Sequence, residues 1–95
     1  MIQTDYGLKQ EVNMASFTGN INTEGQFESV ATLTDLSITS GKTYTLQVRN
    51  FVQLRLGDGI IDVNTTAPFT YVAGSDDLEI NTPQGATLLT VIEGA

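Results

Sequence analysis

The feature that most constrains the fold is an alternation of apolar and polar residues in the middle of the chain, from Lys42 to Leu56. Because successive side chains of a β-strand point to opposite faces, this pattern predicts strands with one apolar and one mostly polar face. The apolar side of the pattern consists of Tyr44, Leu46, Val48, Val52, Leu54 and Leu56. Asn50 interrupts the apolar series and favours a turn. The segment therefore predicts two short strands, about 43–48 and 51–56, or else one bent strand.

Short apolar stretches separated by turn residues continue along the second half of the chain. Gly57-Asp58-Gly59 favours a tight turn, since glycine adopts positive φ without steric strain. Strands are predicted at about 60–63, 69–72 and 78–80, and Pro68 favours an edge position for the second of them. A last strand, about 86–92, is apolar on both faces and is expected to be buried or central. Together these elements predict an all-β, antiparallel sandwich or small barrel of about 6–8 short strands.

The region before the central strands has a less regular pattern. Residues 26–38 are apolar without a clear period and are expected to contain one or two further strands. In residues 1–25, apolar side chains are spread among polar ones and glycines, which leaves two interpretations open. This segment is either the first strand and loop of the same core or an extended arm that packs on a neighbouring subunit. The predicted division is therefore 1–25, arm or first strand, and 26–95, the sandwich or barrel domain.

The composition argues against several classes of chemistry. The 95 residues contain no His and no Cys, so the side chains that most often serve as nucleophile, general base or zinc ligand are missing. Eleven acidic and four basic residues give a formal net charge of -7, which disfavours binding to nucleic-acid phosphates and to anionic membranes. No apolar run approaches the roughly 20 residues of a membrane-spanning helix. We therefore expect a non-enzymatic protein with no cofactor, nucleic-acid partner or membrane.

Two kinds of turn resemble functional motifs only in part. The stretch Ser40-Gly41-Lys42-Thr43 ends like a phosphate-binding loop, but Leu36 stands where the first glycine is required, and a strand pattern follows instead of a helix. The tight carboxylate groupings are Asp58 with Asp62 and Asp76 with Asp77. Neither has the spacing of a calcium-binding loop, and aspartate is common in turns because it hydrogen-bonds its own backbone. No metal site is predicted at either grouping.

Interface contacts are predicted at two places. Phe51 shares its predicted face with Arg49 and Arg55, and aromatic and arginine side chains are enriched in protein interfaces. If the chain turns at Asn50, however, Phe51 can belong to the core. The apolar residues proposed as anchors of the N-terminal segment on a neighbouring subunit are Tyr6, Met14 and Phe17.

Four stretches of the chain follow one another in a familiar order and spacing. They are Gly41–Val48, Thr66–Pro68, Asp77–Ile80 and Gly85–Val91. In this respect the chain resembles small β-structured virion proteins of tailed bacteriophages, namely head-decoration, cement and fibre-type modules. It departs from them in two ways. Ala73-Gly74-Ser75 replaces a frequent Pro-Gly turn, and the penultimate strand carries Leu78 and Ile80 in place of an aromatic residue.

The resemblance implies a non-enzymatic structural role in the virion. Such proteins form homo-oligomers, often trimers, that bind the major capsid protein or another virion protein and add contacts across subunit boundaries. Many symmetric copies on a particle gain avidity from weak individual contacts. The alternative function is a stand-alone β module that recognises a carbohydrate or a protein on a host surface.

Overall fold

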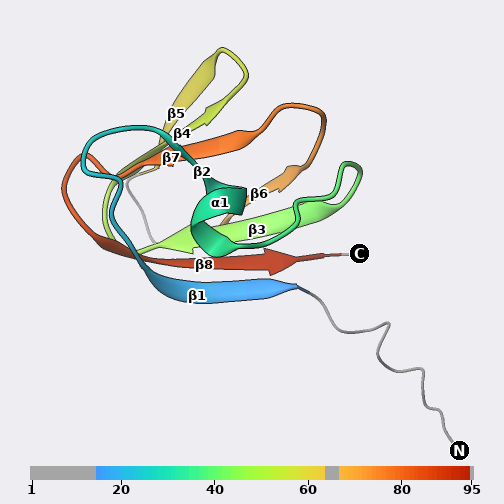
Figure 1. Ribbon diagram of the computed structural model, residues 1–95, viewed down its shortest axis with the longest axis horizontal. Coiled ribbons are helices and arrows are strands. Elements are labelled where there is room, and N and C mark those ends of the chain that lie inside the picture. The colour runs from blue at the N-terminus through green and yellow to red at the C-terminus, as the bar shows by residue number, and fades with distance from the viewer. Residues whose placement is uncertain (1–14, 64–66, 95) are drawn as a thin grey trace, which may run out of the picture.

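The computed structural model describes residues 15–63 and 67–94. Within these ranges the chain forms eight strands in two antiparallel sheets, which confirms the predicted all-β class (Figure 1). A single short helix, α1 (Val30–Thr34), follows the second strand. The strands are β1 (Ser16–Ile21), β2 (Glu28–Ser29), β3 (Thr43–Val48), β4 (Val52–Leu56), β5 (Gly59–Val63), β6 (Phe69–Val72), β7 (Leu78–Asn81) and β8 (Thr87–Glu93).

The connections between strands alternate between the two sheets. The first sheet has the order β1-β8-β3-β6 and the second has the order β2-β7-β4-β5. Every connection carries the chain into the other sheet except the β4–β5 hairpin, whose strands are neighbours. This strand order is that of an eight-stranded jelly roll, a two-sheet antiparallel architecture. It leaves β1 and β6 at the edges of the first sheet, and β2 and β5 at the edges of the second.

The alternation in the central segment is confirmed residue by residue. The apolar side chains of β3 and β4 are buried from Tyr44 to Leu54, while their odd-numbered neighbours are only half-buried. At Arg49 and Asn50 the chain bends and crosses to the second sheet, so the segment forms two strands and not one bent strand. The hydroxyl of Thr87 stabilises this crossing, because its Oγ1 accepts hydrogen bonds from the backbone N–H groups of Arg49 (3.0 Å) and Asn50 (2.9 Å).

Residues 26–38 were expected to contain one or two strands, and one very short strand is found, together with a helix that was not expected. Only the two-residue strand β2 forms there, followed by the single turn of α1. Ser29 caps the helix, since its Oγ accepts a hydrogen bond from the backbone N–H of Thr32 (3.4 Å). Thr34 ends it by donating its hydroxyl to the Val30 carbonyl (2.7 Å). These local hydrogen bonds compete with strand pairing, which apolar content alone does not reveal.

The last strand is central, as predicted, but only one of its faces is buried. β8 pairs with β1 on one side and β3 on the other. Leu89 and Val91 point into the core, whereas Leu88 is half-buried and Ile92 is 48% exposed on the outer face. The outer face stays exposed because the sandwich has only two layers and nothing in the described chain covers it.

The N-terminal interpretations are resolved for part of the segment. Ser16–Ile21 is the edge strand β1, paired along its whole length with β8 from Ser16↔Ile92 to Ile21↔Thr87. Residues 16–21 thus form a first strand of the same sandwich. Residues 1–14, which include Tyr6 and Met14, lie outside the described residues.

Candidate functional site

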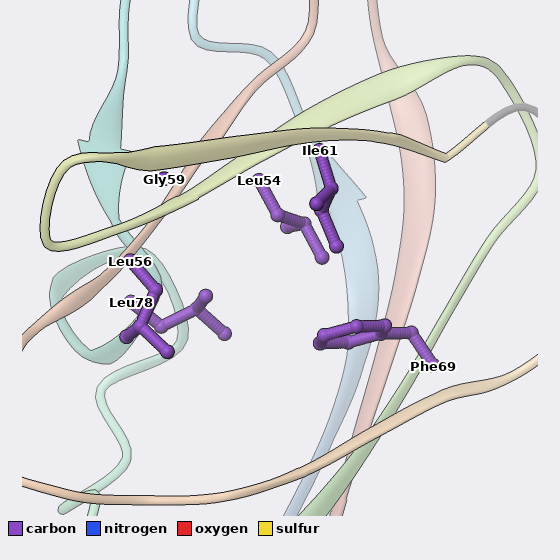
Figure 2. Close-up of a pocket in the computed structure, with 6 residues that line it drawn as sticks. All are labelled: Leu54, Leu56, Gly59, Ile61, Phe69 and Leu78. Atoms are coloured by element: carbon purple, nitrogen blue, oxygen red, sulfur yellow. The ribbon is translucent and has the colours of Figure 1, made fainter.

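An apolar groove lies between the β4–β5 hairpin and β6. Its cavity volume is about 320 Å³, and its lining is Leu54, Leu56, Gly59, Ile61, Phe69 and Leu78. These residues come from four strands and both sheets. Figure 2 shows Leu54 and Ile61 pointing from the hairpin toward the Phe69 ring, with Leu56 and Leu78 beside them.

The strand register explains why these side chains share one surface. In the hairpin, Leu54 lies opposite Ile61 and Leu56 lies opposite Gly59, so all four belong to the inner face of the second sheet. On the other side of β4, Leu56 lies opposite Leu78 of β7. The groove is thus an extension of the hydrophobic core along the inner face of the second sheet.

The groove is open because the opposite sheet does not cover the hairpin. Leu54 is 3% exposed, but its cross-strand partner Ile61 is 45% exposed although it points to the inner face. The edge strand β6 is four residues long and pairs only with the first part of β3, from Thr43 to Leu46. The chain reverses at Gly57, where φ is +60°, and β5 returns beside β4 beyond the part of the second sheet that β6 covers. The inner face of β5 is therefore an apolar surface without a covering layer in the described chain.

Among the described residues, Phe69 is the aromatic side chain that lines the groove, and Tyr71 lies two positions further along β6 without lining it. The Phe69 and Tyr71 rings stack on β6 with centroids 6.1 Å apart, and Tyr71 lies 6.0 Å from the Tyr44 ring. Burial raises the pKa of the Tyr71 hydroxyl, and the nearby Tyr44 and Asp77 add to this shift. The Tyr71 hydroxyl is therefore neutral at physiological pH. Among the described residues that line the groove, none is charged. Such a surface favours apolar side chains over polar or ionic ligands.

Two of the four carboxylates in the predicted groupings accept hydrogen bonds from other side chains of the chain. Asp62 accepts a hydrogen bond from the Gln53 amide (3.2 Å), and Asp77 accepts one from the Ser29 hydroxyl (3.0 Å). A carboxylate oxygen of Asp76 lies so close to Gly57 that a Cβ added there would meet it at 3.0 Å. In the described part of the chain, no three acidic side chains converge on a point where a metal ion could be held.

The predicted interface residues are dispersed by the fold. Phe17 lies on the inner face of β1 and packs against the core of its own subunit. Arg49 is exposed at the bend between the sheets, and Phe51 is half-buried just before β4. Arg55 makes contacts within the chain: its Nε donates to Glu79 (2.7 Å), and its guanidinium lies 4.4 Å from the centre of the Phe27 ring.

The residues of the groove were not identified from the sequence as a site. Leu54 and Leu56 fit the predicted core, and Phe69 belonged to a predicted strand, so nothing marked them as uncovered. The available signal was Ile60-Ile61, two adjacent bulky apolar residues directly after a tight turn. On a strand their side chains point to opposite faces, and both are more than two-fifths exposed, at 52% and 45%.

Comparisons with known proteins support the fold alone. No protein-family model matches the chain, and no curated protein matches it. Among solved structures, the chain is similar to a de novo designed double-stranded β-helix determined by solution NMR. The TM-score is 0.64 at 8% sequence identity, over 84% of this chain and 99% of the designed one. Within the described residues, no helix is long and apolar enough to cross a membrane.

Proposed function

We propose that this protein is a non-enzymatic structural protein of a bacteriophage virion, of the capsid-decoration or cement type, which joins neighbouring subunits. The observation that carries the proposal is the open apolar groove. Leu56 and Ile61, which line it, are 37% and 45% exposed, and apolar surface of this kind gains free energy when a partner covers it. An apolar groove without charged groups suits a protein segment better than a polar substrate.

The groove also offers free backbone groups beside its apolar lining. β5 and β6 are edge strands of their sheets, so each has one side on which no strand of the described residues lies. An extended segment that paired with one of these edges would place alternate side chains into the groove, the recognition mode called β-augmentation. Such a segment needs apolar residues at every second position.

The chain carries a sequence with this property at residues 1–14. Its large apolar residues at even positions are Ile2, Tyr6, Leu8, Val12 and Met14. Its charged residues, Asp5, Lys9 and Glu11, all stand at odd positions. In β1 the side chains that face the core of the same subunit stand at odd-numbered positions, as Phe17 shows. The large apolar residues of 1–14 named above stand at even-numbered positions, so they do not continue this core-facing series. We therefore assign residues 1–14 of a neighbouring copy as the occupant of the groove.

This arrangement is consistent with a closed oligomer. A contact between a segment of one copy and a groove of the next is heterologous, and heterologous contacts generate rings when the rotation closes, of which a trimer is one. Fully extended, 14 residues span roughly 46 Å at about 3.3 Å per residue, which is enough to reach across a small neighbouring domain. The phage resemblance supports placing such a ring on a capsid or tail.

The first test measures oligomeric state with a matched pair of variants. Ile61→Asp puts a charge into the groove, and Ile60→Asp puts the same charge on the opposite face of the same strand. Light scattering coupled to size exclusion, at a concentration low enough to dissociate weak contacts, should show an oligomer for the wild-type chain and for Ile60→Asp, and a monomer for Ile61→Asp. A wild-type monomer, or equal behaviour of the two variants, would contradict assembly through the groove. A monomer whose melting temperature rises with a sugar would instead favour the stand-alone binding module.

The second test identifies the occupant. The chain has no cysteine, so the double variant Leu8→Cys, Ile61→Cys contains one designed pair. Under mild oxidation we expect disulfide-linked dimers and trimers on a denaturing gel, and mixing the two single variants should give a linked dimer. A disulfide formed only within one chain would show that residues 1–14 cover their own groove. Failure to link at all would remove this segment as the occupant.

A further inference from the structure

In the part of the chain that the structure describes, the four strands of the first sheet place no charged residue on its outer face. This face presents eleven side chains from four strands: Ser16, Thr18, Asn20, Thr43, Thr45, Gln47, Thr70, Val72, Leu88, Thr90 and Ile92. The chain contains eleven acidic and four basic residues. Of those in the described ranges 15–63 and 67–94, none stands at an outward position of β1, β3, β6 or β8. The outer face of the second sheet is different, since Arg55, Asp62 and Glu79 all lie on it. The contrast marks the first face as a distinct surface.

The side chains on this face form regular rows. One row runs across all four strands through Ser16, Ile92, Thr45 and Thr70, and the next runs through Thr18, Thr90 and Gln47. The threonine hydroxyls of neighbouring strands bond to each other, Thr18 to Thr90 at 3.3 Å and Thr45 to Thr70 at 3.1 Å. Their methyl groups remain as the contact surface beside Val72 and Ile92, which are 64% and 48% exposed.

We infer that this face packs against the same face of a second copy, sheet on sheet, around a two-fold axis. Electrostatic repulsion between copies selects this face. Each chain has a net charge of -7, so two copies repel each other wherever acidic surfaces meet. On the outer face of the first sheet this repulsion is smallest, because no charge has to be desolvated or opposed there. Depletion of charge is also what distinguishes the centre of an interface from other protein surface.

The shape of the face favours a second copy over a flat partner. Antiparallel sheets twist, and two twisted sheets pack face to face when their strands are offset by about 30°. β-branched threonine, valine and isoleucine side chains are short and suit such packing. A contact of identical surfaces around a two-fold axis is self-complementary, so the same eleven residues serve both copies.

The size of the face predicts a weak contact. Four strands spaced by about 4.8 Å, with about five residues each, cover a footprint of roughly 300 Å². A stable interface buries about 800 Å² on each partner, so this face alone gives a dimer that dissociates on dilution. This inference does not depend on the groove, which lies between the sheets and involves different residues.

The experiment places one lysine on each outer face of the full chain. Both variants also carry Ile61→Asp, which removes the proposed groove contact, so that failure of one proposal is not mistaken for failure of the other. Thr45→Lys lies on the central strand β3 of the first sheet, and Gln53→Lys lies on the central strand β4 of the second. The two lysines change the net charge equally. Sedimentation equilibrium over a concentration series should show a dimer that Thr45→Lys weakens by at least about ten-fold, while Gln53→Lys leaves it unchanged.

A mixing experiment tests whether the face binds itself. Thr45→Glu should also dissociate the dimer, but an equimolar mixture of Thr45→Lys and Thr45→Glu should form a mixed dimer, visible by native mass spectrometry. Circular dichroism and thermal melts of each variant show whether it is folded. Absence of any dimer in the Ile61→Asp parent, equal weakening by both lysines, or no mixed dimer from two folded variants would overturn the inference.

Discussion

The interior of the sandwich is closed in one part and open in another, although the two parts share the same strands. Leu54 and Ile61 face each other across the β4–β5 hairpin on the same inner face, yet Leu54 is 3% exposed and Ile61 is 45% exposed. The side chains around Leu54 meet the opposite sheet, while those around Ile61 extend past the short edge strand β6. The closed part therefore sets the stability of the subunit, and the open part is available for a partner.

The largest expected effect is on a side chain in the closed part. Leu46 is 3% exposed in the centre of β3, between Val91 and Phe69 on the neighbouring strands. Leu46→Ala leaves a cavity there and should lower the free energy of unfolding by about 2–5 kcal/mol. Urea denaturation followed by circular dichroism measures this change. A loss of only a few tenths would mean that the two sheets do not pack at this point.

The next effect comes from buried hydrogen bonds that close the loops beside the core. Thr23 and Thr82 are 2% and 1% exposed and bond to each other reciprocally. The Thr23 N–H donates to the Thr82 hydroxyl (2.9 Å), and the Thr82 N–H donates to the Thr23 hydroxyl (2.8 Å). Thr82→Val keeps the shape but leaves a buried N–H without its acceptor, which should cost about 1–3 kcal/mol. Thr18→Val on the exposed outer face is the control and should change stability little, because water replaces its bond.

A pH-dependent effect is expected at the end of β8. The backbone N–H of Ala15, together with hydrogen bonds from Lys42 and Tyr44, holds the pKa of Glu93 below its usual value, although desolvation opposes this shift. The Lys42 ammonium lies 3.4 Å from the carboxylate. Because the folded-state pKa is the lower one, the ionised Glu93 stabilises the fold above the unfolded-state pKa. This contribution is lost as pH falls through the folded-state pKa.

Glu93→Gln isolates this contribution from the other acidic residues. The free energy of unfolding of the wild type should exceed that of the variant at neutral pH, and the gap should close in acid as the wild-type carboxyl is protonated. Chemical denaturation at a series of pH values measures the gap. A difference that is independent of pH would show that Glu93 acts through packing and not through its charge.

These contrasts explain which parts of the fold could be predicted from the sequence. The alternation of apolar and polar residues predicted β3 and β4, because a strand with one buried face has apolar residues at every second position. Turn residues at Gly57, Gly74 and Gly85 marked the boundaries of the later strands. α1 was missed because its formation depends on hydrogen bonds of Ser29 and Thr34 that carry no apolar pattern. The strand order could not be derived, since pairing between β1 and β8 joins residues more than 65 positions apart.

The candidate site was harder to predict than the fold. The sequence pattern of an apolar residue on an inner face does not depend on whether the opposite sheet covers that residue. The sequence therefore does not show that Leu54 is covered and Ile61 is not. Their difference arises from the length of β6, a property of another strand. Arg55 is predicted as an interface residue because it shares the polar face of its strand with Phe51. In the structure its guanidinium contacts Glu79 and Phe27, both distant in sequence. The exposure of a side chain depends on tertiary packing, so the periodicity of a single strand does not predict it.

The smallest expected effect on folding is at the open part itself. Ile61→Ala removes a side chain that is nearly half exposed and leaves no closed cavity, so it should lower the free energy of unfolding of the monomer by about 1 kcal/mol. Leu54→Ala, at the cross-strand position, should cost about 2–5 kcal/mol, because its space is enclosed. Denaturation at concentrations low enough to keep both variants monomeric gives the comparison. Equal losses would mean that the groove is covered in solution. A small loss for Ile61→Ala together with weakened self-association would separate binding from folding at adjacent positions.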